Sequence, residues 1–283
     1  MPRMSELEAL LLGIIQGLTE FLPISSSGHL ILVPWLQEYT FLQENESFNK
    51  TFDVALHAGT LVAVISYFWS DLTGMARGVV RSLSTRSIET TDQRLGWAII
   101  AGTAPAVIVG GLGEGFIDES LGEPWMIAIL LIVFGLVLAW ADRLPQRRSI
   151  DSVGVKEGFY MGIAQASALA PGVSRSGVTI SAARYLGLDR DSAARFAFLL
   201  LVPAVAGATV LKAIGAITDG LPDGVVGPMI LGMITSAISS YAAIAFMLRY
   251  VRTHSYDAFV IYRVVAGLFV LGLIATGVRD ATF

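Results

Sequence analysis

The chain has 283 residues, of which 54% are hydrophobic and 15% are charged, and its mean hydropathy is +0.67. This composition is too apolar for a soluble domain and is typical of an all-α protein with several membrane-spanning helices, so we expect one integral membrane domain over residues 1–283. The small net charge of -4 gives no reason to expect nucleic acid as a partner, and the lack of cysteine excludes disulfides, thiolate catalysis and cysteine-based metal sites.

The first apolar segments are too short to cross a membrane, which takes about 20 mainly apolar residues. Residues 7–22 and 28–36 are separated by the sequence Pro-Ile-Ser-Ser-Ser-Gly at 23–28, which breaks a helix and presents hydroxyl groups. Two short helices joined by a polar turn predict a re-entrant hairpin, tolerated at membrane depth only where the turn is buried in protein or lines a wet cavity. Residues 158–188 repeat this design around a turn that contains Arg175.

Six longer apolar runs are long enough to cross the membrane. They cover residues 52–69, 95–113, 124–141, 192–217, 225–250 and 258–278. Each half of the chain is therefore expected to hold one re-entrant hairpin and three transmembrane helices.

The two halves also resemble each other in sequence around the polar turns. A shift of 149 positions (165 minus 16) aligns these identical pairs without a gap: Glu8 and Glu157, Gly13 and Gly162, Ile14 and Ile163, Gln16 and Gln165, Ser25 and Ser174, Ser27 and Ser176, Gly28 and Gly177. Such a match indicates an internal duplication, with repeat one at about residues 5–142 and repeat two at about 154–280. Because each repeat has an odd number of spans, the second would enter the membrane upside down, which predicts an inverted repeat.

Positive charge is unevenly distributed among the predicted loops. Loops on one side carry Arg77, Arg81, Arg86, Arg94, Arg143, Arg147, Arg148, Lys156, Arg184, Arg190, Arg249 and Arg252. Loops on the other side carry acidic residues and neither lysine nor arginine. By the positive-inside rule, the basic side is cytoplasmic and both termini lie outside.

The turn at residues 171–179, Pro-Gly-Val-Ser-Arg-Ser-Gly-Val-Thr, places an arginine between two apolar runs. An arginine near the bilayer centre costs roughly 2.5–3.5 kcal/mol, so Arg175 predicts an anionic ligand. Its planar guanidinium matches phosphate or carboxylate oxygens, and nearby hydroxyls and glycine-exposed amides can add donors. The alternative is a plain turn between two helices, with Arg175 reaching a lipid headgroup.

The first turn carries the complementary groups. Gln16 and Glu20 are four residues apart, so they share a helix face, and Glu20 directly precedes the serine-rich turn. A buried glutamate needs a partner, for which Arg175, His29 or a divalent cation would serve. Ser26 and His29, three apart, can also share a face. The alternative for Glu20 is a helix end at the membrane interface.

Two further polar features lie within the predicted spans. Asp53 and His57 share a helix face, but the helix dipole alone would favour Asp53 there, so a structural and a functional role remain equally open. Arg263 lies about one turn inside the last span. Its side chain could therefore extend towards the membrane interface.

The segments from Gln16 to His29 (Gln-Gly-Leu-Thr-Glu-Phe-Leu-Pro-Ile-Ser-Ser-Ser-Gly-His) and from Pro171 to Thr179 closely resemble the bacitracin-resistance family of undecaprenyl-diphosphate phosphatases. The resemblance extends over essentially the whole chain. It implies a multi-pass enzyme of the bacterial inner membrane that removes the terminal phosphate of undecaprenyl diphosphate, recycles the lipid carrier for peptidoglycan and confers bacitracin resistance. Family members often have glutamate where Gln16 stands, which shifts the acidic role to Glu20.

Two alternatives belong to other classes of protein. The phosphatidic-acid phosphatase type also uses a Ser-Gly-His turn and a Ser-Arg dipeptide, but it needs a further histidine, and residues 178–188 contain none. An inverted-repeat lipid-phosphate flippase or secondary transporter stays open, because broken helices in inverted repeats also build transporters.

The residues and the resemblance together predict a site with Glu20, Ser26, His29 and Arg175 as catalytic residues. The predicted substrate-binding residues are Gln16, Ser25, Ser27, Gly172, Ser174, Ser176 and Thr179. Glu20 would hold a divalent cation, Mg or Ca, or orient His29. Ser26 could attack phosphorus after His29 takes its proton, or His29 could attack directly; the position of Ser26 at a helix N-terminus favours the first.

The partners expected are undecaprenyl diphosphate and membrane lipid, with no nucleic acid, and a homodimer is left open. The resemblance implies that the active site faces the periplasmic or outer side.

Overall fold

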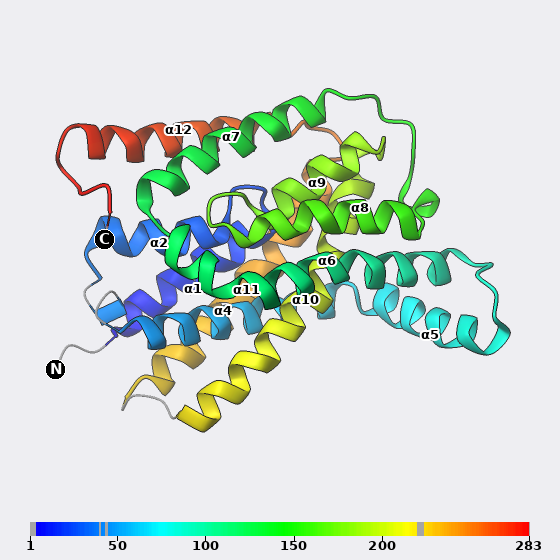
Figure 1. The fold of residues 1–283 in the computed structure, drawn as a ribbon, viewed down its shortest axis with the longest axis horizontal. Helices are drawn as coiled ribbons and strands as arrows, with labels where there is room; N and C mark the ends of the chain where they lie inside the picture. Colours follow the sequence, from blue (N-terminus) through cyan, green and yellow to red (C-terminus); the bar gives the residue numbers. More distant parts are fainter. Residues whose placement is uncertain (1–3, 40, 43–44, 220–223, 283) are drawn as a thin grey trace.

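The computed structural model describes residues 4–39, 41–42, 45–219 and 224–282, and this part of the chain is built from α-helices (Figure 1). Two short 3-10 helices, η1 (Ile150–Ser152) and η2 (Ser167–Leu169), flank α8. The α-helices are α1 (Glu6–Phe21), α2 (Ser26–Gln37), α4 (Glu46–Tyr67), α5 (Trp69–Thr85), α6 (Thr91–Ser120), α7 (Pro124–Asp142), α8 (Val155–Ala166), α9 (Arg175–Tyr185), α10 (Arg190–Asp219), α11 (Val226–Tyr250) and α12 (Asp257–Ala275). The predicted all-α fold is confirmed.

The two predicted hairpins are present as pairs of short helices. In the first, α1 starts with a capping box, because the Ser5 side chain accepts from the Glu8 amide at 3.1 Å and the Glu8 carboxylate accepts from the Ser5 amide at 2.9 Å. The second consists of α8, η2 and α9. The helix–turn–helix pattern is therefore confirmed, while entry of the two turns from opposite faces of a membrane stays a prediction.

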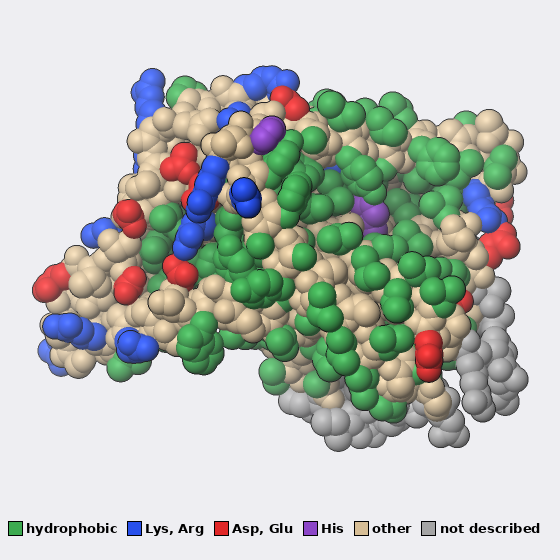
Figure 2. Space-filling model, turned by 180° about the vertical axis from the view of Figure 1, so that it is seen from behind, with side chains coloured by type: hydrophobic (Ala, Val, Ile, Leu, Met, Phe, Trp, Pro, Cys, Tyr) green, Lys and Arg blue, Asp and Glu red, His purple; other side chains and the backbone are tan. Residues whose placement is uncertain are grey.

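The chain is a multi-pass membrane protein by the length and composition of its helices. Within the described residues, α6, α7, α10, α11 and α12 each contain a stretch long and apolar enough to cross, and α4 with α5 forms a sixth candidate bent by 81°. All six predicted runs lie mainly in helices. Figure 2 shows one broad face of the molecule covered mostly by hydrophobic side chains, with charged side chains gathered mainly towards one edge.

Helix α5 was not predicted: residues beyond 69 were expected to form a basic loop. Its arginines, Arg77 and Arg81, are exposed, whereas Met75 and Ser82 are buried. The Ser82 hydroxyl accepts from Trp97 Nε1 at 2.8 Å, which ties α5 to α6. The segment is thus an amphipathic helix packed along its neighbour, as Figure 1 shows.

Each hairpin packs against a helix from the other half of the chain. Helix α1 approaches α11 where Gly13 lies on the carbonyl of Gly232, and α8 approaches α6 where Gly162 lies on the carbonyl of Gly102. A side chain at either hairpin glycine would overlap that backbone. Gly13 and Gly162 are partners in the sequence match, so the duplication has a counterpart in the packing; the inverted orientation and the repeat boundaries stay predictions.

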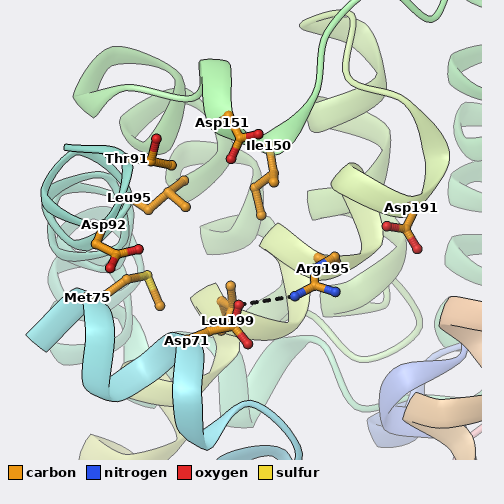
Figure 3. A pocket seen from close by; sticks show the side chains of 10 residues that line it. All are labelled: Asp71, Met75, Thr91, Asp92, Leu95, Ile150, Asp151, Asp191, Arg195 and Leu199. Atoms are coloured by element: carbon orange, nitrogen blue, oxygen red, sulfur yellow. Dashed lines mark hydrogen bonds and ion pairs between the residues drawn. The ribbon is translucent and has the colours of Figure 1, made fainter.

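A cavity of about 340 Å³ lies between α5, α6, η1 and α10 (Figure 3). Its lining includes four aspartates and one arginine; Arg195 bonds Asp71 at 3.1 Å. This excess of carboxylates repels an anionic ligand. The cavity is therefore a poor candidate for a phosphate site.

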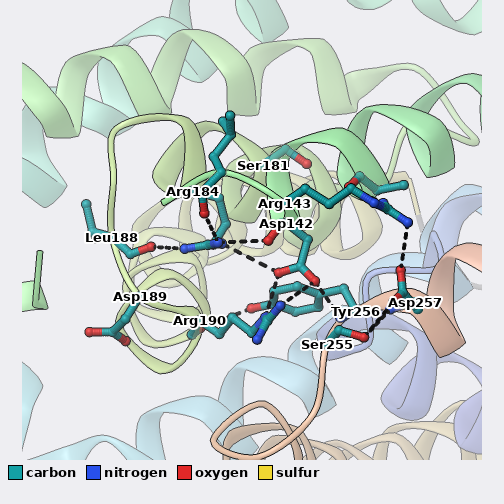
Figure 4. A network of polar contacts seen from close by, with 12 residues as sticks. Asp142, Arg143, Ser181, Arg184, Leu188, Asp189, Arg190, Ser255, Tyr256 and Asp257 are labelled. Carbon is teal, nitrogen blue, oxygen red and sulfur yellow. Dashed lines mark hydrogen bonds and ion pairs between the residues drawn. The ribbon is translucent and has the colours of Figure 1, made fainter. Parts of the chain in front are cut away.

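A buried ionic network joins the end of α7 to three other helices, α9, α10 and α12 (Figure 4). The Asp142 carboxylate accepts from Arg190 Nε at 2.7 Å and Nη2 at 3.0 Å, and from the Tyr256 amide at 3.0 Å. Arg184 Nε lies 3.6 Å from the same carboxylate. Arg184 was expected in a loop, but it is wholly buried in α9. One carboxylate thus fixes the ends of α7, α9, α10 and α12 relative to one another.

This network predicts a large stability effect at Asp142. Asp142→Asn keeps the shape but leaves the buried Arg184 without a counter-charge, so the free energy of unfolding should fall by about 3 kcal/mol. The control is Arg143→Gln, since Arg143 and Asp257 form an exposed pair at 3.6 Å, worth under about 1 kcal/mol. Thermal unfolding in detergent compares the two. Equal stability would mean that backbone carbonyls alone satisfy Arg184.

Candidate active site

The two polar turns have the same backbone conformation. Ser25 has φ +76° and Ser174 has φ +74°, values that are uncommon for residues other than glycine. Each serine side chain caps the following helix: Ser25 accepts from the Gly28 amide at 3.3 Å and Ser174 from the Gly177 amide at 3.2 Å. The turns therefore present two helix N-termini, α2 and α9, which favour negative charge.

The two turns also contact each other directly. The Gly172 amide donates to Ser25 Oγ at 3.1 Å, and Ser176 Oγ donates to the Leu22 carbonyl at 3.2 Å. Gly172 has φ +98°, and a Cβ there would lie 2.8 Å from the carbonyl oxygen of Ile127. Only glycine fits this position, so residues about 150 positions apart are held in one compact unit.

Arg263 holds this unit from the side of α12. It is wholly buried, so the expectation that it extends to the membrane interface is wrong. Its Nη1 donates to the Pro23 carbonyl at 3.1 Å, and its Nη2 donates to the carbonyls of Gly172 at 2.8 Å and Val173 at 3.1 Å. A further bond from Nε reaches the Leu131 carbonyl of α7 at 2.9 Å. Backbone oxygens of both turns, rather than a headgroup, thus satisfy this arginine.

Glu20 lies at the centre of the polar cluster, with 3% of its surface exposed. Its Oε2 accepts from Gln16 Nε2 at 3.0 Å and from Ser26 Oγ at 2.6 Å. His57 Nε2 lies 3.5 Å from the same oxygen, and Arg175 Nη1 lies 3.7 Å from Oε1. The structure therefore brings together four predicted residues, Gln16, Glu20, Ser26 and Arg175, and adds His57.

The position of His57 sets the charge of this cluster. Its Nδ1 donates to the Asp53 carbonyl at 2.7 Å, because a carbonyl only accepts. An ion pair between Nε2 and Glu20 then requires a second ring proton, which makes His57 a cation. In that state the Glu20 carboxylate faces two positive groups, His57 and Arg175, and positive groups of this kind suit an anion.

His29 has other partners. Its Nδ1 lies 2.7 Å from the Ser25 carbonyl, which fixes the proton on that nitrogen, and its Nε2 accepts from the Tyr262 hydroxyl at 2.6 Å. The Tyr262 ring stacks on the imidazole with centroids 5.6 Å apart. The Ser26 hydroxyl thus donates to Glu20 while His29 bonds α12, so a catalytic role for His29 stays a prediction.

The remaining predicted residues line the two turns. Ser27 is half-buried in the first turn of α2, and Ser174 Oγ lies 3.4 Å from Ser176 Oγ. Thr179 is buried, and its hydroxyl has no hydrogen-bond partner within the described part of the chain. Arg175 Nη1 is likewise buried without a hydrogen bond. These free donors suit a ligand with several acceptor oxygens.

For a divalent cation, this site offers a single carboxylate ligand, Glu20. Among the described residues, no group of three or more histidine or acidic side chains could hold a metal ion. Magnesium is often bound by one or two carboxylates together with substrate phosphates, so Glu20 could share such an ion with a bound diphosphate.

Sequence reasoning left three residues out of the site. His57 was left undecided, Arg263 was assigned to the interface, and Tyr262 was not considered. The signal for Arg263 was present, since an arginine inside an apolar span predicts an internal partner. Tyr262 and His57 gave weaker signals because their contacts join helices distant in sequence.

Comparison with known proteins identifies the family. The family described as bacitracin resistance protein BacA matches residues 9–269. The chain belongs to the BacA family. The match includes both turns and Arg263.

Several relatives in the BacA family are similar over nearly their whole length. A protein of Geotalea daltonii named undecaprenyl-diphosphatase is 46% identical over 272 residues, covering 95% of this chain and 98% of the relative. Proteins of the same name from Geobacter sulfurreducens and Nocardioides sp. are 48% and 45% identical, covering 93% and 97% of this chain and 96% and 98% of the relatives.

The cluster predicts that the BacA-family site depends on the charge at position 20. Glu20→Gln removes the counter-charge of Arg175 and the strong acceptor of Ser26, so turnover should fall by about 100-fold or more. The control is Glu8→Gln on the same helix, because glutamine also completes a capping box. Phosphate release by purified protein measures both. A Glu20→Gln variant with more than half the normal activity would contradict a central role for Glu20.

Proposed function

We propose that the chain hydrolyses undecaprenyl diphosphate to undecaprenyl phosphate and inorganic phosphate, which recycles the lipid carrier for cell-wall synthesis and gives resistance to bacitracin. The relatives' name supports this activity. The observation that carries it is the Glu20 cluster, in which Ser26 and Arg175 meet one buried carboxylate at two helix N-termini. That arrangement supplies a nucleophile, a base and an anion clamp for phosphoryl transfer.

In the proposed first step, Ser26 Oγ attacks the terminal phosphorus and its proton passes to Glu20 Oε2, which already accepts it at 2.6 Å. The bond from phosphorus to the bridging oxygen breaks, and undecaprenyl phosphate leaves with that electron pair and the proton from Glu20. Arg175 and the amides at the starts of α2 and α9 stabilise the charge on the phosphoryl oxygens. Glu20 replaces the predicted His29 as the base in this proposal, because it accepts the hydrogen bond from Ser26 Oγ.

In the second step, a water molecule gives a proton to Glu20 and attacks the phosphoserine. The bond from phosphorus to Ser26 Oγ breaks, the serine regains a proton, and inorganic phosphate leaves. Glu20 and the substrate's phosphates would hold a divalent cation, Mg or Ca, which would neutralise phosphate charge when bound. The site is built within one chain, so this chemistry requires no second copy.

Because the substrate has a long lipid tail, its headgroup must enter the site from the membrane. At about 0.8 kcal/mol per buried methylene, the tail stays among lipids while the headgroup enters the protein. Figure 2 shows a histidine side chain at the bottom of a hollow within the apolar face, which suits lateral entry of such a headgroup.

We expect the bacterial inner membrane as the location, with the site open to the outer side and the basic loops inside. Single cysteines at the exposed Ser149 and, on the other side, at Glu119 in α6 should then label from inside and outside respectively. A second position expected on the outer side, Asp223, lies outside the described residues. Labelling of both from the same side would contradict this topology.

Phosphate release tests the function directly. Purified protein in detergent should release inorganic phosphate from undecaprenyl diphosphate, and rapid acid quench should leave acid-stable phosphate on Ser26. A metal requirement predicts loss of release in EDTA and recovery with Mg or Ca.

Two results would contradict parts of this proposal. No release by well-folded protein would favour the flippase or transporter, because transport needs two compartments and hydrolysis does not. An acid-labile, base-stable phosphate on His29 would instead keep the activity and overturn Ser26 as nucleophile.

A further inference from the structure

Gln165, near the end of α8, has a buried amide with no partner. The residue is 2% exposed, and neither its oxygen nor its nitrogen has a hydrogen-bond partner within the described part of the chain. A primary amide offers two donors and an acceptor oxygen, and burying it unpaired destabilises the folded protein. Folded proteins rarely keep such a group without a ligand or an ordered water to satisfy it.

Other unpartnered atoms gather on the same two hairpins. Of the nine buried side-chain atoms without a partner among the described residues, five belong to Gln16, Gln165, Arg175 and Thr179. All four residues lie on α1, α8 or α9, close to the two turns. Gln16 and Thr179 were predicted to bind substrate and Arg175 to be catalytic, so Gln165 is the additional member of the set.

The sequence repeat indicates where Gln165 lies relative to Arg175. Gln16 and Ser26 both bond the same oxygen of Glu20, at 3.0 and 2.6 Å. The shift of 149 positions aligns Gln16 with Gln165 and Ser26 with Arg175. The turns share their backbone conformation, and Gly13 and Gly162 make equivalent close approaches three residues before the two glutamines. Gln165 should therefore stand beside Arg175 as Gln16 stands beside Ser26.

The residue that aligns with Glu20 in the second half explains why the Gln165 amide has no hydrogen-bond partner among the described residues. In the first half, Glu20 accepts from the glutamine, whereas the aligned position in the second half is Leu169, which has no polar group. Gln165 thus keeps both amide donors unbonded, and Arg175, beside which the repeat puts it, also has an unbonded Nη1. An uncharged donor beside a guanidinium suits non-bridging phosphate oxygens.

We propose that Gln165 is a substrate-binding residue that donates to the diphosphate on the Arg175 side of the site. The inference rests on the proposed phosphatase activity and adds one residue, from the second half, to its binding set. The bonds it makes are present in the bound substrate and in the transition state alike. Its loss should therefore raise KM and leave kcat nearly unchanged.

A packing role and a binding role predict opposite results for Gln165→Met. Methionine has a similar length and shape but no hydrogen-bonding groups. If Gln165 served the fold, the change would lower the melting temperature. Because its amide is unpaired, we expect the melting temperature of the ligand-free protein to stay the same or rise. KM for undecaprenyl diphosphate should rise about tenfold, which corresponds to the loss of about one hydrogen bond.

The experiment uses the purified full-length chain in detergent and measures kcat, KM and melting temperature for each variant. Gln165→Glu is the second variant: it keeps the shape, loses the donors and adds a negative charge, so its KM should exceed that of Gln165→Met. Thr209→Val on α10 is the matched control, because Thr209 Oγ1 is also buried and unpartnered among the described residues but lies outside both hairpins. This control should keep the wild-type KM.

Three outcomes separate the inference from the proposed function. A wild-type KM in Gln165→Met would overturn the inference, since it would show that a resident water satisfies the amide. A lower melting temperature with unchanged KM in either variant would overturn it in favour of packing. Absence of phosphate release by the wild-type protein would instead contradict the proposed function itself.

Discussion

The structure depends on satisfying the backbone of two helix-breaking turns inside the protein. Irregular backbone at membrane depth leaves carbonyl oxygens that lipid does not hydrogen-bond. Arg263 meets this need by donating to Pro23 in the first turn and to Gly172 and Val173 in the second. One buried guanidinium therefore holds both turns together, and the helix N-termini that follow them are kept side by side.

This arrangement explains how a site for a multiply charged headgroup can exist in so apolar a chain. Glu20, a single carboxylate, faces Arg175 from the other half of the sequence and His57 from α4. The ionic groups thus stabilise one another before a ligand arrives. Several donors nevertheless remain unbonded among the described residues, including Arg175 Nη1 and the Thr179 hydroxyl, and an incoming phosphate would complete the hydrogen bonding of the proposed site.

Much of the fold and part of the site could be predicted from the sequence, because their signals are local. Hydrophobic run length gave the spans, the pair Ser5 and Glu8 marked the start of α1, and the two polar motifs located Glu20 and Arg175. The contacts of Arg263 with Pro23, 240 positions away, depend on how distant segments pack and were missed. Helix α5 was missed for a different reason. Its arginines led to the prediction of a basic loop, although its apolar residues lie on one face of a helix.

The central claim is that turns from the two halves form one catalytic unit. The most direct test is a double-mutant cycle of kcat/KM with Ser26→Ala from the first turn and Arg175→Lys from the second. If the turns act together, the double variant should lose about as much activity as the worse single variant. Losses that multiply, as for independent sites, would contradict the account.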